Sequence, residues 1–259
     1  MLRLSFLVLA SAFAFTSHVQ ALEASAANKK SIESGLMQNA ETANAFTELE
    51  YQLVEASGLL SLSQQIKNSA QRLIAGSIEK PAAVSINHAQ HFAIAKSLAK
   101  RWTEEEWQQR LLVLIHDMPV ATQRSIQQQL LHPMIKAAQR KERVAISVQS
   151  DPAYQLYMNK LRQRPPAASR WKLVENLDKQ SGFSQIIIQA RSVVINDIQQ
   201  QVKGWQPEGA WEKQARQDVL EFLFYAYRKT PNTELKQIAD SFKQPELSQF
   251  YKDVLNTVK

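Results

Sequence analysis

Residues 233–255, TELKQIADSFKQPELSQFYKDVL, have the pattern of two amphipathic helices joined at Pro245. Apolar side chains recur three or four positions apart on both sides of the proline, which places them on one face of each helix. These side chains are Leu235, Ile238, Ala239 and Phe242 before the proline, and Leu247, Phe250, Tyr251, Val254 and Leu255 after it. Proline is well tolerated in a first helical turn. The stretch therefore predicts a helix, a bend and a second helix that close against a common core.

The rest of the chain has the composition of a helical protein. Of its 259 residues, 44% are hydrophobic and 21% are charged, while only 6 are glycine. Glutamine, alanine, leucine, lysine and glutamate dominate long stretches, and these residue types favour helix. We therefore predict an all-α fold, a helical bundle of about ten helices. Alternating valine and isoleucine in residues 143–150 leave one strand open as an alternative.

Residues 1–21 have the layout of a secretory signal peptide. Arg3 is an early cation, residues 4–15 form an apolar run, and the small residues Val19 and Ala21 precede the expected cleavage site. The run is too short to span a bilayer, and no later stretch is long and apolar enough to do so. We expect a protein of the bacterial periplasm without a transmembrane segment after cleavage. A retained interfacial anchor is the alternative.

The remaining chain divides into residues 22–150, a first helical half, residues 151–169, a basic helix and proline-rich linker, and residues 170–259, a second helical half. A shift of 124 residues places Ser57 on Ser181 and Gly58 on Gly182, and keeps the helical phase of many apolar positions. This agreement indicates an internal duplication. Two unrelated amphipathic regions can also be aligned in this way, so both explanations stay open.

Two segments of the second half carry a family resemblance. Residues 173–187, LVENLDKQSGFSQII, and residues 233–250, TELKQIADSFKQPELSQF, resemble the domain of unknown function 2059 family of secreted bacterial proteins. This chain has Gln244 and Glu246 beside Pro245, where the family pattern has a small or hydroxyl residue before the proline and a leucine-glycine pair after it. The resemblance implies an all-helical exported domain without an assigned activity, so it transfers no catalytic residue.

The net charge indicates the class of partner, and the absence of cysteine bears on how the fold is stabilised. The formal net charge of +7 becomes +6 if Arg3 leaves with the signal peptide, and there is no cysteine, so no disulfide supports the fold. A basic protein usually meets nucleic acid or an anionic surface. Because export excludes chromosomal DNA and RNA, we expect no nucleic acid partner. The expected partners are an envelope protein or an anionic envelope polymer or lipid surface.

The most distinctive charged stretch is KLRQRPPAASRWK at residues 160–172. No acidic residue occurs between Pro152 and Val174, and a tryptophan lies among the cations. The candidate residues for binding an anionic partner are Lys160, Arg162, Arg164, Arg170, Lys172 and Trp171. Cations beside amphipathic rings are typical of sites that contact anionic headgroups. A solvated linker between two helical halves would have the same composition.

Other residues offer weaker chemistry. His88 and His91 are three positions apart and could supply two metal ligands, but the sequence places no third ligand, so we expect no metal and no other cofactor. The acidic run at residues 103–106 is explained as the start of a helix. Neither a nucleophile elbow nor a glycine-rich phosphate loop occurs, so no catalytic residue is assigned.

Three functions follow, in order of preference. The first is an exported, non-catalytic binding or interaction module of the bacterial envelope that engages a protein or an anionic envelope component. The second is a carrier of an apolar or lipid-like ligand held between the helical halves, which predicts an enclosed apolar cavity. The third is an enzyme acting on cell-wall or lipid material, which requires polar groups that converge in a cleft.

Overall fold

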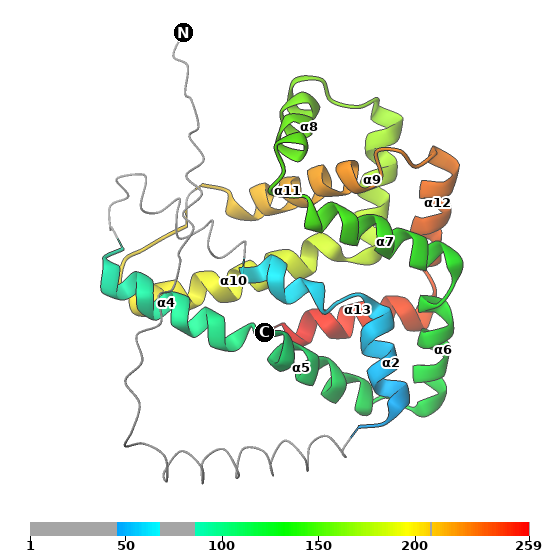
Figure 1. The fold of residues 1–259 in the computed structure, drawn as a ribbon, viewed down its shortest axis with the longest axis horizontal. Helices are drawn as coiled ribbons and strands as arrows, with labels where there is room; N and C mark the ends of the chain where they lie inside the picture. Colours follow the sequence, from blue (N-terminus) through cyan, green and yellow to red (C-terminus); the bar gives the residue numbers. More distant parts are fainter. Residues whose placement is uncertain (1–45, 68–85, 208, 259) are drawn as a thin grey trace, which may run out of the picture. The chain divides into compact units, whose positions relative to one another are not determined.

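The computed structural model describes residues 46–67, 86–207 and 209–258, and these residues form helices and their connections without any strand. The expected signal peptide, residues 1–21, lies outside the described residues. The helices are α2 (Glu48–Ser57), α4 (His88–Arg101), α5 (Glu104–His116), α6 (Val120–Leu130), α7 (Pro133–Ser147), α8 (Pro152–Gln163), α9 (Ala168–Ser181), α10 (Phe183–Gln201), α11 (Trp211–Ala226), α12 (Asn232–Ser241) and α13 (Pro245–Thr257). Residues 61–67 are helical as well. The predicted all-α bundle is confirmed (Figure 1).

Local sequence signals set several helix starts. The Thr103 hydroxyl accepts a hydrogen bond from the backbone N–H of Glu106 at 3.0 Å, and three glutamates occupy the first turn of α5. Acidic side chains there interact favourably with the helix dipole, as expected for the run at residues 103–106. Pro133, Pro152 and Pro245 each stand in a first helical turn, where the missing N–H is not needed.

The pair of helices predicted from residues 233–255 is present as α12 and α13. Pro245 is the first residue of α13. The apolar faces of the two helices point into the protein, since Leu235, Ile238, Phe250 and Val254 are all buried. In Figure 1, α12 lies against α9 and α7, and α13 lies against α5 and α6. The bend at the proline thus closes both helices onto the same core.

The strand considered for residues 143–150 is wrong, because α7 continues to Ser147. The apolar positions that decide the segment follow a helical period. Ile135, Ala138 and Ala145 are buried on one face of α7, whereas Val144 is exposed. Valine and isoleucine alternate only over the last residues of the helix, and packing against α11 and α12 overrides their strand preference.

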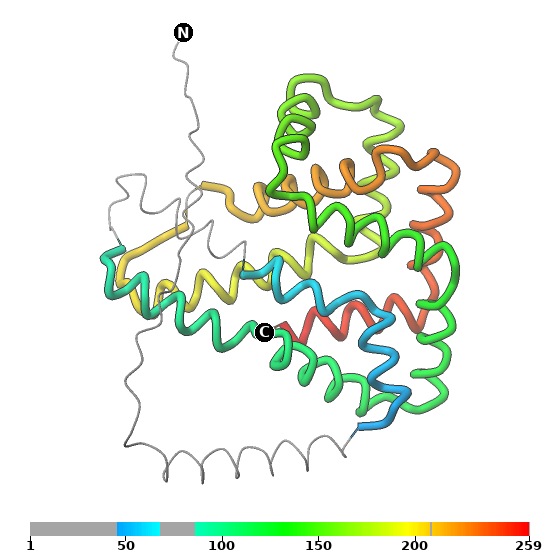
Figure 2. The backbone as a smooth tube through the Cα atoms, viewed as in Figure 1, coloured from blue at the N-terminus to red at the C-terminus, as the bar shows by residue number. Residues whose placement is uncertain are grey.

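Several helices of the first half have a counterpart 124 residues later in the second half. Helices α2 and α9 end at Ser57 and Ser181, and each is followed by a glycine with positive φ, 71° at Gly58 and 67° at Gly182. Shifted by the same number, α4, α5 and α6 start within four residues of α11, α12 and α13. Along the chain, helices α7 and α8 come after the first series and before the second, which can be followed by colour in Figure 2.

Both halves contribute to one continuous core. Trp107 from the first half and Phe250 from the second belong to the same cluster of buried apolar side chains, and both are almost completely inaccessible to solvent. Trp102 and Trp107 lie in this core with their rings 5.8 Å apart. Among the described helices, none has the length and apolar character that crossing a membrane requires.

Candidate functional site

An open cleft of about 910 Å³ lies among the described residues. Its lining includes residues of the segment 55–67, at the end of α2 and beyond it, and residues along α7. Residues at the start of α10 and the side chains of Phe242 and Tyr251, from the α12–α13 pair, line it too. Segments of both predicted halves therefore meet at this cleft, and its volume is within the usual range for a small-molecule site.

Helix α7 is fixed to the end of α2 by Gln139. The Gln139 side-chain amide donates to the carbonyl oxygen of Ala56 at 2.7 Å and to that of Ser57 at 3.2 Å. These carbonyls belong to the last turn of α2, which lacks helical partners for them. Gly58 then takes the left-handed conformation, and the chain turns along the cleft wall. The wall is thus held by hydrogen bonds between segments distant in sequence.

Glu142 is the one acidic side chain on the core stripe of α7, between Ala138 and Ala145. The Tyr227 hydroxyl donates a hydrogen bond to Glu142 Oε1 at 2.6 Å, and Tyr227 is 0% exposed. Glu142 keeps partial exposure toward the cleft, although its carboxyl lies deep among protein atoms. Burial raises the pKa of Glu142 to about 7, against the opposing effect of the Tyr227 hydrogen bond. This carboxyl therefore holds a proton up to near-neutral pH.

Aromatic side chains line the cleft together with this carboxyl. Tyr251 is one of them, and burial together with the charge of Glu142 raises the pKa of its hydroxyl. Phe242 packs against Tyr251 with ring centroids 5.7 Å apart, and Phe183 also lines the cleft. The lining is therefore mixed, because the polar side chains of Ser61 and Ser63 belong to it as well as these rings.

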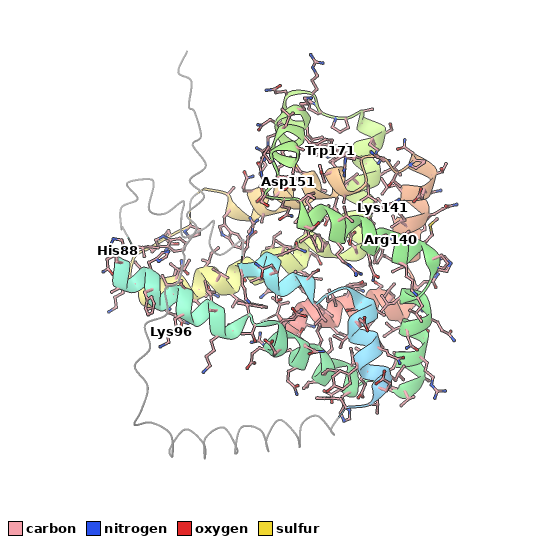
Figure 3. The ribbon with its side chains drawn as sticks, viewed as in Figure 1. His88, Lys96, Arg140, Lys141, Asp151 and Trp171 are labelled. Carbon is pink, nitrogen blue, oxygen red and sulfur yellow. The ribbon has the colours of Figure 1, made fainter. Side chains whose placement is uncertain are left out.

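The cleft has charged side chains of both signs in its lining, with Glu55 and Glu104 among the acidic ones. Lys136, Arg140 and Arg143 are exposed cations along one side of α7, and none of them forms an ion pair with any residue that the structure describes. Lys141, in contrast, is bound to Glu234 and donates to Thr230 Oγ1 at 2.9 Å. Figure 3 shows Arg140 and Lys141 as neighbours on α7. Three cations are thus available to an anionic group at the cleft.

Apolar side chains accompany these cations at the cleft. Leu131 is 44% exposed and Val144 is 54% exposed, and both line it. Large apolar residues exposed at a concave surface are typical of ligand sites. A ligand that fits both features has an apolar body and an anionic end.

The structure separates the predicted basic segment into two groups. Arg162 and Arg170 are used within the fold: Arg162 binds Glu221, and Arg170 donates to Asn232 Oδ1 and to the Tyr227 carbonyl oxygen, both at 2.7 Å. The remaining cations, Lys160, Arg164 and Lys172, are exposed and have no ion pair with a described residue. Half-buried Trp171 donates to Glu175 and packs on Phe224.

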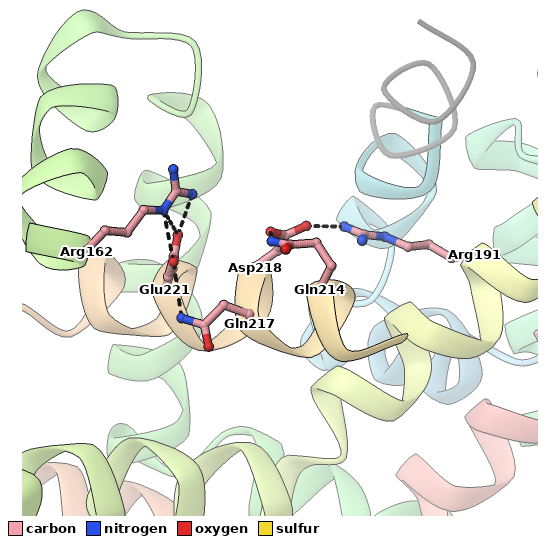
Figure 4. A network of polar contacts seen from close by, with 6 residues as sticks. All are labelled: Arg162, Arg191, Gln214, Gln217, Asp218 and Glu221. Atoms are coloured by element: carbon pink, nitrogen blue, oxygen red, sulfur yellow. Dashed lines mark hydrogen bonds and ion pairs between the residues drawn. The ribbon is translucent and has the colours of Figure 1, made fainter. Parts of the chain in front are cut away.

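The contact between Arg162 and Glu221 belongs to a polar network along α11 (Figure 4). Arg162 donates from Nε and Nη2 to the Glu221 carboxylate, with the shortest distance 2.7 Å, and Gln217 donates to the same carboxylate at 3.1 Å. One helical turn away, Arg191 of α10 binds Asp218 at 2.9 Å. The network ties α8 and α10 to α11, so Arg162 has a structural role.

Replacing Arg162 by glutamine is expected to lower the free energy of unfolding by about 1–2 kcal/mol. The Glu221 side chain is only 6% exposed and would lose its cation, whereas Arg162 itself is 56% exposed, which limits the effect. Urea unfolding followed by circular dichroism measures the change. The matched control is Arg164→Gln, two residues later, which removes an exposed charge and should change stability by less than about 0.5 kcal/mol. Equal effects for the two variants would contradict a structural role for Arg162.

The two candidate metal ligands stand at the start of α4. His88 is exposed and His91 is half-buried. The described part of the chain contains no group of three or more histidine, cysteine, aspartate and glutamate side chains arranged to hold a metal ion. Figure 3 places His88 well apart from Arg140 and the cleft along α7. The histidine pair and the cleft are therefore separate features.

Comparisons with known proteins return no match: the chain matches no protein-family model, no curated protein and no solved structure. The resemblance of residues 173–187 and 233–250 to the domain of unknown function 2059 family therefore stays a prediction.

Sequence analysis missed Glu142 and the cations of α7. A signal was present, since Glu142 stands at the helical spacing of the apolar residues Ile135, Ala138 and Ala145. A single glutamate on an otherwise apolar stripe indicates a buried carboxyl with a specific partner. Lys136, Arg140 and Arg143 share one side of the same helix, which is visible from their spacing. What the sequence does not show is that this side borders a cleft.

Proposed function

We propose that this is an exported, non-catalytic binding protein of the bacterial envelope, which holds an anionic amphiphile in the cleft along α7. The proposal combines two functions expected from the sequence: binding of an anionic envelope component, and carriage of an apolar or lipid-like ligand. It takes residues 1–21 to be a cleaved signal peptide, and therefore a periplasmic location. The observation that supports it most strongly is a set of exposed cations, Lys136, Arg140 and Arg143, which have no ion pair with a described residue and line a cleft together with apolar side chains.

Charge complementarity decides the class of ligand. Cations without protein partners attract a phosphate or a carboxylate, and their attraction is strongest where nearby apolar surface excludes water. The apolar side chains of the lining, such as Leu59, Ile186 and Phe242, suit a hydrocarbon chain. An anionic lipid with a single chain satisfies both parts of the site. Binding needs only these contacts.

The test removes the three cations of α7 together. Lys136→Gln, Arg140→Gln and Arg143→Gln in one variant should weaken binding of a single-chain phosphatidylglycerol at least tenfold, because each cation near an anionic group contributes about 1 kcal/mol. Binding is measured by isothermal titration below the micellar threshold of the lipid, at low ionic strength. Raising the salt concentration should reduce the difference between the wild type and the variant.

The chain offers a matched control in its other group of exposed cations. The variant Lys160→Gln, Arg164→Gln and Lys172→Gln removes the same charge from the basic segment and should bind the lipid as the wild type does. This control also tests the second candidate function, in which the exposed cations of the basic segment contact an anionic surface. Loss of binding in this variant alone would replace the cleft by the basic segment as the binding site. Loss in neither variant would contradict both.

A further inference from the structure

The two oxygens of the Glu142 carboxyl have different surroundings. Oε1 accepts the hydrogen bond from Tyr227, whereas Oε2 has no hydrogen-bond partner among the described residues and is not among their buried unpaired atoms. Because Glu142 lines the cleft, Oε2 is the oxygen that a ligand can reach. One oxygen therefore fixes the position of the carboxyl, and the other is available for recognition.

We propose that Glu142 recognises the acyl carbonyl of the ligand, by donating a hydrogen bond from its protonated Oε2 to the oxygen of an ester or amide. This inference rests on the proposed function and makes the ligand more specific: an acyl chain joined through a carbonyl to an anionic headgroup. The chain lies among the aromatic walls, the carbonyl lies beside Glu142, and the headgroup meets the cations of α7. Tyr227 acts as a positioning residue, since it holds Oε1 and does not line the cleft.

The charged and titratable groups around Glu142 agree with this role. Tyr227 follows α11, Tyr251 comes from α13, and Glu234 of α12 is already bound to Lys141 on α7 itself. The exposed cations of α7, Lys136, Arg140 and Arg143, line the same cleft, as do Glu55 and Glu104, and no ion pair joins any of the described cations to Glu142. The groups that act on the pKa of Glu142 are therefore its burial and the Tyr227 hydroxyl, and no described cation is among them. Its carboxyl keeps a proton to donate up to a pH of about 7.

The experiment compares two lipids that differ only in the proposed contact. An ester-linked single-chain phosphatidylglycerol has the carbonyl, and its ether-linked analogue lacks it, while the phosphate charge of both is constant between pH 6 and pH 8.5. At pH 6 the wild type should prefer the ester about three- to tenfold, the usual worth of one hydrogen bond. At pH 8.5 the preference should disappear, because the ionised carboxylate has no proton to donate.

Two variants separate recognition from folding. Glu142→Gln retains a donor at the same place and should keep the ester preference at both pH values. Glu142→Ala should lose it at both, and binding of the ether lipid reports whether that variant is folded. An ester preference that is absent from the wild type at pH 6, or unchanged in Glu142→Ala, would overturn the inference while leaving the binding site along α7 intact. If neither lipid binds the wild type, the inference and the proposed function both fall.

Discussion

Replacing Trp107 by alanine is expected to lower the free energy of unfolding by about 3–5 kcal/mol, the usual cost of deleting a large buried aromatic side chain. Trp107 is 0% exposed, and its ring packs on Trp102. Its Nε1 also donates a 2.8 Å hydrogen bond to the carbonyl oxygen of Leu59, in the segment that forms one cleft wall. The substitution therefore leaves both a cavity and an unpaired carbonyl. Urea unfolding followed by circular dichroism measures the loss.

Two further variants test whether burial and the hydrogen bond are the causes. Trp107→Phe retains most of the ring volume and should cost less than alanine, about 1–2 kcal/mol, mainly through the lost hydrogen bond. Trp211→Ala removes the same side chain from the half-buried start of α11 and should cost no more than about 1 kcal/mol. A small loss for Trp107→Ala, similar to that for Trp211→Ala, would contradict the core position of Trp107.

Replacing Glu142 by glutamine is expected to raise the free energy of unfolding at pH 8 by about 2–3 kcal/mol, and to change it little at pH 4.5. The folded-state pKa of Glu142, about 7, lies above its ordinary value of 4.5. Between these values the folded protein holds a proton that the unfolded chain has released. Stability therefore falls as the pH rises from about 4.5 to about 7, and the cost remains at higher pH. Glutamine is uncharged at every pH and avoids this cost.

Thermal or urea unfolding at a series of pH values measures this effect as the difference between the wild type and Glu142→Gln. Taking the difference cancels groups that titrate in both proteins, such as Glu50, whose pKa is lowered by its hydrogen bonds with Thr47 and His116 in spite of burial. If Glu142→Gln gives a constant difference from the wild type between pH 4.5 and pH 8, the carboxyl does not carry the expected proton.

The parts of the fold that could be predicted are those fixed by local sequence. Helices α12 and α13 follow from the period of their apolar residues and from Pro245, and the start of α5 follows from Thr103 and the glutamates after it. The core position of Trp107 follows from its spacing within the same helix. In each case the deciding residues lie within one or two helical turns of one another. Such signals do not require knowledge of how helices pack.

The candidate site depends on contacts between distant residues, and these could not be predicted. Tyr227 reaches Glu142 across 85 positions in the chain, and Glu221 reaches Arg162 across 59. The hydrogen bond from Tyr227 gives the Glu142 carboxyl a partner, although the neighbouring positions on that face of α7 are apolar. The second contact explains why a stretch without acidic residues is only partly a free basic surface, since the counter-charge of Arg162 comes from α11. Composition showed that the protein is basic, and packing decides which cations remain available.

The most direct measurement of the central claim is to map where an anionic amphiphile sits. A single-chain phosphatidylglycerol that carries a photoreactive diazirine on its chain is bound to the mature protein, irradiated, and located by peptide mass spectrometry. The account predicts that labelled peptides come from residues 55–67, from α7 and from the start of α10, and that the lipid without the diazirine competes for them. Labelling confined to α8 and α9, or labelling that does not respond to competition, would contradict a ligand site in the cleft along α7.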